Sequence, residues 1–115
     1  MKTYEYLNPI LTGCDYNNLH LYKIGIIGIV ASTGIYTSDE IGGWETLDIY
    51  TLPTGWRTVG HNSYAQYAQE GSDSPMWIMV NYNGSQKICI RNNSPSSKIA
   101  NNLRCSITYV IDPNL

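Results

Sequence analysis

Residues 76–92, with the sequence MWIMVNYNGSQKICIRN, decide the fold because they predict a β-hairpin. Asn83 and Gly84 lie at its centre, and both residue types tolerate the positive φ angles of a two-residue type I′ turn. Such a turn would pair Val80 with Lys87. Side chains alternate between the two faces of a strand, so this register also predicts which face lines the core. The expected core face carries Trp77, Met79, Ile88 and Ile90.

The composition indicates one neutral, aromatic domain. A chain of 115 residues is the length of a single domain and can bury about two-thirds of its unfolded surface. Charged residues make up 14%, against a typical value of about 25%, and the chain has ten tyrosines and no phenylalanine. A net charge of −2 without a basic cluster argues against nucleic-acid and acidic-membrane partners.

The three cysteines have no metal-ligand spacing, and their odd number leaves at least one unpaired. Cys89 and Cys105 lie in strand-like runs, where a free cysteine behaves as a small hydrophobic residue. We therefore expect reduced thiols, synthesis in a reducing cytoplasm, and no metal or cofactor. The first residues have no apolar run of the kind found in a signal peptide.

Short alternating segments separated by turns predict the fold class. Expected strands outside the hairpin are residues 17–23, 26–31, 45–51, 56–60 and 103–111. Residues 1–16 are read either as a strand or as a lead-in or linker. Residues 32–34 and 52–55 are read as turns, and residues 35–44 and 61–75 as loops, with one helical turn as an alternative within the second loop. The prediction is an all-β, jelly-roll-like antiparallel β-sandwich of about seven to eight short strands, with the head domain at 17–115.

Two of these segments carry further expectations. Residues 103–111 alternate most cleanly, and their inner face holds Leu103, Cys105, Ile107, Tyr109 and Ile111. Gly28 interrupts the apolar run 26–31, which indicates a bulge or a close approach of another group to the backbone.

No catalytic constellation is evident. The sequence has no nucleophile elbow, no zinc-protease motif and no phosphate loop. Glu45 and Asp48 fall on opposite faces of an expected strand, which makes them a poor acid–base pair. His20 lies in an alternating strand, where a structural histidine is favoured over a ligand. We therefore expect a protein that is not an enzyme.

Aromatic and amide side chains in loops point instead to saccharide binding. Aromatic rings stack on the C–H surfaces of sugars, while amides and carboxylates bond the sugar hydroxyls. The candidate ligand-binding residues are Trp44, His61, Tyr64, Gln66, Tyr67 and Asp73. For Trp44, Tyr64 and Tyr67, a place in the core, at a subunit interface or on an ordinary β surface is an equal alternative. A plain loop role is favoured for His61, and a core role for Trp56.

Several motifs resemble one family. Phage tail proteins carry a Leu-Pro-x-Gly-Tyr-Arg-Pro motif in a C-terminal β domain, and residues 52–57 read LPTGWR. A hairpin around an Asn-Gly pair and a last strand with a tyrosine, here Tyr109, complete the pattern. Upstream, residues 22–25 (YKIG) match the family's opening turn. Trp56 replaces the usual tyrosine, and Thr58 replaces the proline.

Over about residues 18–112 the chain thus resembles the head domain of a phage receptor-binding protein or tail fibre from phages of Gram-positive hosts. The resemblance implies a homotrimer at the tail tip of the virion, in contact with other tail or baseplate proteins. It also implies reversible binding to host cell-wall saccharide. No binding residue transfers from the family, because its sugar contacts vary with the host. A trimer would also cover surplus apolar surface and add avidity.

Two alternatives remain open from the sequence. One is a structural baseplate or tail-fibre assembly module without glycan binding. The other is an enzyme that degrades polysaccharide, for which Glu45, Asp48, Glu70 and Asp73 would be the residues to test.

Overall fold

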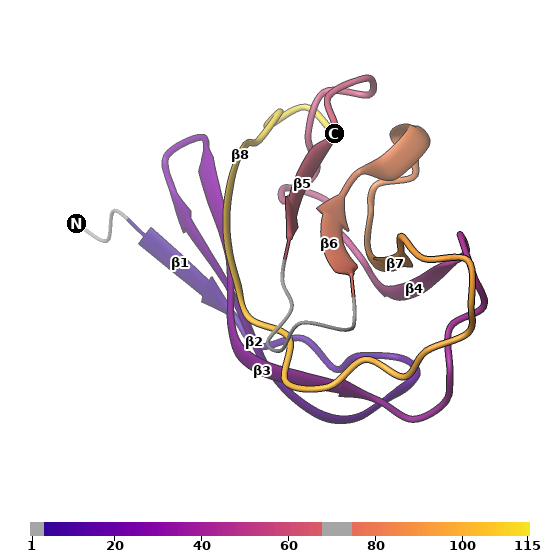
Figure 1. Ribbon diagram of the computed structural model, residues 1–115. Coiled ribbons are helices and arrows are strands. Elements are labelled where there is room, and N and C mark those ends of the chain that lie inside the picture. Colours follow the sequence, from indigo (N-terminus) through magenta and orange to yellow (C-terminus); the bar gives the residue numbers. More distant parts are fainter. Residues whose placement is uncertain (1–3, 68–74) are drawn as a thin grey trace.

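The computed structural model describes residues 4–67 and 75–115 (Figure 1). Within these ranges the chain forms eight strands and one short 3-10 turn. The strands are β1 (Tyr4–Leu7), β2 (Cys14–Ile24), β3 (Ile27–Thr37), β4 (Thr46–Thr51), β5 (Tyr64–Tyr67), β6 (Met76–Val80), β7 (Lys87–Asn92) and β8 (Cys105–Val110), and the turn is η1 (Tyr82–Gly84). None of the described residues form a helix with the length and apolar character needed to cross a membrane.

The strands form two antiparallel sheets that face each other, with orders β1-β2-β3-β8 and β4-β7-β6-β5 (Figure 1). In the second sheet β5, β6 and β7 are neighbours in sequence, and β4 lies beside β7 in a Greek-key arrangement. The predicted all-β, antiparallel β-sandwich is therefore confirmed.

The core lies between the two sheets and follows the alternation of the strands. In β8 the predicted inner residues are all buried, as are Leu19 and Leu21 of β2. The second sheet contributes Met76, Ile78 and Val80, each fully buried. The central strands of both sheets thus present apolar rows to the opposite sheet.

The predicted hairpin exists, but its register differs by one residue from the prediction. Ile78 pairs with Ile90, and Val80 pairs with Ile88. The connection is longer than a two-residue turn, because the pairing ends where the Asn81 N–H bonds the Lys87 carbonyl at 2.8 Å. Asn83 and Gly84 do have the predicted positive φ angles, 55° and 71°, and the Ser85 N–H bonds the Tyr82 carbonyl at 3.2 Å, so the predicted tight turn is present. The prediction that this turn alone connects the two strands is wrong.

The side chain of Asn81 is the physical reason for this difference. Asn81 adopts a left-handed conformation (φ 60°) and is completely buried. Its amide donates hydrogen bonds to carbonyls of residues 59, 60 and 62 at 3.2, 3.4 and 2.8 Å. Its carbonyl oxygen accepts from the Gln86 N–H at 2.7 Å. The chain gains these bonds only if the pairing of β6 with β7 ends at residue 81, one register step away from the predicted pairing.

The changed register exchanges the two faces of β6. Trp77 and Met79, predicted to line the core, lie on the outer face and are half-buried. Ile78 and Val80 take the core positions instead and pair with Ile90 and Ile88. The predicted core positions of Ile88 and Ile90 are confirmed. The expectation that Trp77 and Met79 belong to the core is therefore corrected.

The expected turn at 32–34 and the start of the expected loop at 35–44 are also wrong, since β3 continues to Thr37. Pairing with both β2 and β8 holds this region extended up to Ser32. Beyond it, the Ile35 N–H bonds the Leu103 carbonyl at 3.0 Å, and the Ile35 side chain is fully buried. Tertiary pairing outweighs the local turn preference of Ser-Thr-Gly.

Residues 56–60 do not form the predicted strand, because only Thr58 makes a bridge, to Ile111. Trp56 is 7% exposed, as expected of a core residue. The expected loop 61–75 contains β5, and its residues 68–74 lie outside the described part of the chain. Of the two readings of residues 1–16, the strand is the one found over Tyr4–Leu7, where β1 pairs with β2.

Gly28 has the close neighbour that its place in an apolar strand indicates. The ring of Tyr109 lies where a Cβ atom on Gly28 would stand, at 2.5 Å from the ideal position. Tyr109 is buried, and its hydroxyl donates to the Trp56 carbonyl at 2.8 Å. Because Gly28 has no side chain, the ring of Tyr109 on the neighbouring strand β8 can lie directly over the backbone of β3.

Replacing Gly28 with alanine should therefore displace Tyr109 and lower the free energy of unfolding by about 1–3 kcal/mol, as overpacked cores do. Gly60 is the matched control, because no atom lies within 4 Å of its ideal Cβ position. Urea unfolding of Gly28→Ala and Gly60→Ala would measure both effects. Equal stability of the two variants would contradict this packing.

The three cysteines are free, and two of them belong to the buried part of the sheets. Burial raises the pKa of Cys105 to about 12, and burial together with the charge of Asp48 raises the pKa of Cys89 to about 12. Burial and the charge of Asp15 raise the pKa of the half-buried Cys14 to about 11. The folded protein therefore keeps these thiols protonated in alkaline solution.

Stability should consequently fall in alkaline solution. Unfolded thiols lose their protons near pH 8.5, while the folded ones hold them to about pH 11–12, so the unfolded state binds fewer protons in this interval. Below about pH 8.5 this contribution is constant, and it is lost progressively as the pH rises. At pH 10 each buried thiol should lower the free energy of unfolding by roughly 2 kcal/mol relative to its value below about pH 8.5.

Urea midpoints at pH 7 and pH 10 test this expectation, with Cys89→Ala as the comparison variant. The variant should lose less stability between the two pH values than the parent. An identical loss in both proteins would show that Cys89 does not contribute.

Candidate functional site

Two of the predicted site residues close the sandwich instead of facing open solvent. β5 and β8 are edge strands of different sheets and lie side by side (Figure 1). The Ser106 N–H donates to Gln66 Oε1 at 2.7 Å, and the Val110 N–H donates to the Tyr64 hydroxyl at 3.2 Å. Side chains of β5 thus satisfy the backbone edge of β8, so we do not include Tyr64 and Gln66 in the candidate site.

Tyr67 points to the other side of β5 and belongs to an aromatic cluster. It pairs with Trp77 across the two strands, and the two rings meet edge to face with centroids 5.9 Å apart. Tyr67 is 49% exposed. Trp77 is half-buried and lies on the face of β6 opposite to the core. The outer face of the second sheet therefore presents two adjoining aromatic side chains.

Arg91 extends this cluster onto β7. It is the backbone partner of Trp77, and its guanidinium carbon lies 5.9 Å from the ring centre of Tyr82. Its Nε donates to Asn93 Oδ1 at 2.9 Å, which fixes the orientation of the guanidinium group. We call Tyr67, Trp77, Tyr82 and Arg91 the aromatic platform.

The platform combines ring surfaces with hydrogen-bond donors. Tyrosine and tryptophan have an apolar body and a polar end, so they can stack on a ligand and bond it at the same time. Arg91 adds donors to the ligand side, and its contact with Tyr82 holds the two side chains together. Farther along the same sheet Lys87 and Asp48 pair at 3.3 Å. Such a surface suits a flat polar ligand that carries several hydroxyl groups.

Trp44 lies at the same end of the second sheet as Arg91, just before β4. β4 is the edge strand opposite to β5, which carries Tyr67. It is 55% exposed and adopts a left-handed conformation with φ 61°. Its N–H bonds the Ser94 carbonyl at 3.1 Å. A side chain on the preceding residue, Gly43, would collide with the Pro95 carbonyl oxygen. The backbone around Trp44 is therefore fixed while its indole ring faces solvent.

Asn92 holds together the two loops next to Trp44, which are the loop before it at residues 41–42 and the loop after β7 at residues 94–96. It is completely buried at the end of β7. Its amide donates to the carbonyls of residues 41, 42 and 96 at 2.9, 3.3 and 2.9 Å. Its carbonyl oxygen accepts from the Ser94 hydroxyl and N–H at 2.7 and 3.1 Å. One side chain thus satisfies five backbone or hydroxyl groups in two loops.

His61 is not joined to the platform. His61 is exposed in the turn before β5, at the end of that strand away from Tyr67. Asp73 lies outside the described residues. Among the five predicted site residues that the structure describes, only Tyr67 is part of the aromatic platform.

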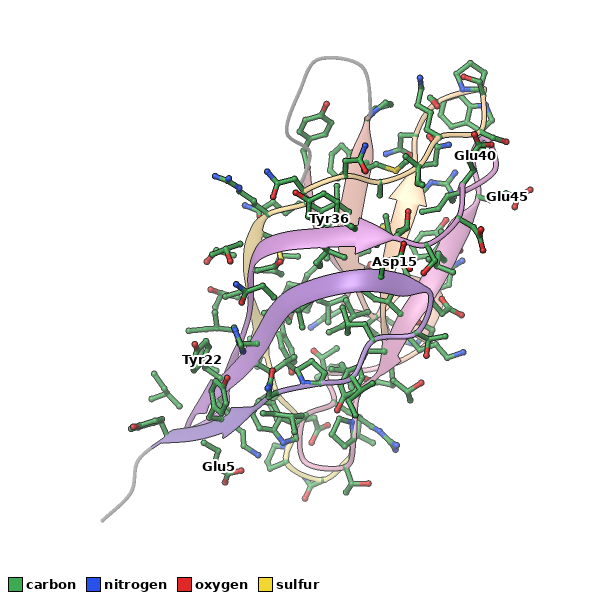
Figure 2. All side chains as sticks on the ribbon, turned by 90° about the horizontal axis from the view of Figure 1, so that it is seen from below. Glu5, Asp15, Tyr22, Tyr36, Glu40 and Glu45 are labelled. Atoms are coloured by element: carbon green, nitrogen blue, oxygen red, sulfur yellow. The ribbon has the colours of Figure 1, made fainter. Side chains whose placement is uncertain are left out.

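A small cleft of about 170 Å³ opens near Trp44 between the start of β4 and the loop after β3. Asp39, Glu40 and Glu45 contribute to its wall. Figure 2 shows Glu40 and Glu45 close together at the end of the molecule far from Glu5. Within the described ranges no group of three or more metal-ligating side chains could hold an ion. The cleft can accept hydrogen bonds from hydroxyl groups.

Sequence reasoning missed Trp77, Tyr82 and Arg91 because it placed Trp77 in the core. A signal for the correct assignment was present. Met76, Ile78 and Val80 are all aliphatic and alternate, and opposite Ile88 and Ile90 they form a complete apolar row. That row leaves Trp77 on the outer face.

The fold and the platform define a class: an antiparallel β-sandwich with an aromatic outer sheet face. Comparison of the chain with family models, with curated proteins and with solved structures found no match.

Proposed function

We propose that the chain is the head domain of a phage tail receptor-binding protein. It binds saccharide on the host cell surface without chemical change, acts as a homotrimer and lies at the tail tip beside other tail proteins. The observation that carries the binding part is the position of Tyr67 and Trp77, which adjoin on the outer face of the sheet beside Arg91.

The chemistry of the platform favours a saccharide. Rings of sugars offer C–H surfaces to aromatic faces, and their hydroxyl groups bond amide, phenol and guanidinium groups. The platform offers phenol, indole and guanidinium groups, and three of its four residues lie on strands of one sheet, so little conformational entropy is lost on binding. With only 14% charged residues, the protein has a surface that relies on neutral hydrogen-bonding groups.

The assignment to a phage tail is supported by the resemblance of the sequence motifs. The motif contains the expected tight turn, which closes over residues 53–56 with Gly55 at φ 86° and the Trp56 N–H bonded to the Pro53 carbonyl. The last strand, β8, carries the tyrosine of the motif, Tyr109, which is buried in the core. Both features fit the domain plan that the motifs imply.

Binding to cell-wall polysaccharide from a panel of Gram-positive bacteria tests the proposal. The parent should bind at least one preparation in a titration calorimeter. Trp77→Ala and Tyr67→Ala should each weaken binding about tenfold or more, because each removes a stacking ring. Tyr36→Ala is the matched control, since Tyr36 is an exposed tyrosine of β3 in the other sheet.

Thermal unfolding shows whether Trp77→Ala stays folded, and the more exposed Tyr67 provides the second test. Unchanged affinity in both variants would overturn the assignment of the platform. A folded parent that binds none of the preparations would favour a structural role in the baseplate. Release of new sugar ends from a polysaccharide would favour an enzyme instead.

A further inference from the structure

The outer face of the first sheet carries an exposed apolar row that crosses all four strands. Tyr4 pairs with Ile24, Ile24 with Ile27, and Ile27 with Val110. These side chains are 54%, 53%, 38% and 40% exposed, respectively. Paired residues point to the same side of a sheet, so the four form one continuous band.

A second row on the same face lies next to this band. Tyr6 pairs with Tyr22, Tyr22 with Ile29, and Ile29 with Thr108. Contact between the rings of Tyr6 and Tyr22, with centroids 5.3 Å apart, shows that they share this face. Figure 2 looks onto this sheet, with Tyr22 near the end that carries β1. We call the two rows the outer apolar face.

No residue of these two rows carries a formal charge. The nearest ion pair, Lys23 with Glu5 at 3.4 Å, belongs to the row between them, which points to the other side. Exposed apolar patches of this kind mark interaction surfaces. Because identical copies bring identical charges together, an uncharged face is one on which two copies can meet without repulsion.

The face suits a protein surface better than a sugar. The ring of Tyr6 is already stacked on His20 at 5.6 Å, and its hydroxyl is hydrogen-bonded to His20 Nδ1 at 2.7 Å. One side of the ring and its polar atom are therefore occupied. The aliphatic side chains of Ile24 and Ile27 offer no hydrogen bonds to hydroxyl groups.

We infer that a second copy of this chain covers the outer apolar face. This inference deepens the proposed multivalent function, because it assigns the contact between subunits to the first sheet. The saccharide platform lies on the second sheet, on the opposite side of the sandwich, and stays open when the copies associate. Subunit contact and ligand contact thus use different sheets.

Sedimentation equilibrium of the full chain over a range of concentrations tests the inference. The parent should reach a multiple of 12.9 kDa. Ile24→Glu should raise the dissociation constant more than about tenfold, because it places a charge within the apolar row that the second copy would cover. Thr46→Glu is the matched control: it adds the same charge at an exposed position of the second sheet and should associate like the parent.

If Ile24→Glu does not fold, Val110→Glu on the same row replaces it. A parent that stays at 12.9 kDa, or an Ile24→Glu variant that associates like the parent, would overturn the inference. A monomer that still binds polysaccharide through Trp77 would overturn this inference and the proposed homotrimer, but not the proposed saccharide binding. Loss of polysaccharide binding in Tyr6→Ala would assign the face to sugar and also overturn it.

Discussion

The buried amide of Asn81 is the interaction on which the second sheet depends. Its hydrogen bonds to the carbonyls of residues 59, 60 and 62 and to the Gln86 N–H determine where the pairing of β6 with β7 ends and the chain begins to turn. The place of the turn determines the register of β6 on β7, and the register determines which side chains face outward. A buried amide without these partners would cost about 1–3 kcal/mol, so the arrangement is strongly favoured.

A second buried amide, Asn92, has the same role at the other end of β7. Together the two asparagines fix loops at both ends of one central strand. Between them the sheet can carry aromatic groups on its outer side, since its inner side already supplies the core with Ile88 and Ile90. The first sheet has an uncharged outer face of its own, so the sandwich offers two chemically different surfaces.

The fold class, the inner face of β8 and the close neighbour of Gly28 could be predicted, because alternation and glycine placement are local properties. The register of the hairpin could not, because the partners of Asn81 lie about twenty residues away in a segment without a strand pattern. The site prediction located Tyr67 from its aromatic loop but missed Trp77, which the wrong register placed in the core. Gln66 was predicted to bind saccharide through its amide, but that amide accepts a hydrogen bond from the Ser106 N–H on the edge of β8.

The most direct test of the central claim uses the three tryptophans of the chain. Their indole N–H signals can be followed by NMR while wall polysaccharide is added, once single substitutions have assigned them. The account predicts that the Trp77 signal shifts with saturation and that the signal of the buried Trp56 does not. A titration that shifts Trp56 and leaves Trp77 unchanged, or that shifts no indole signal, would contradict it.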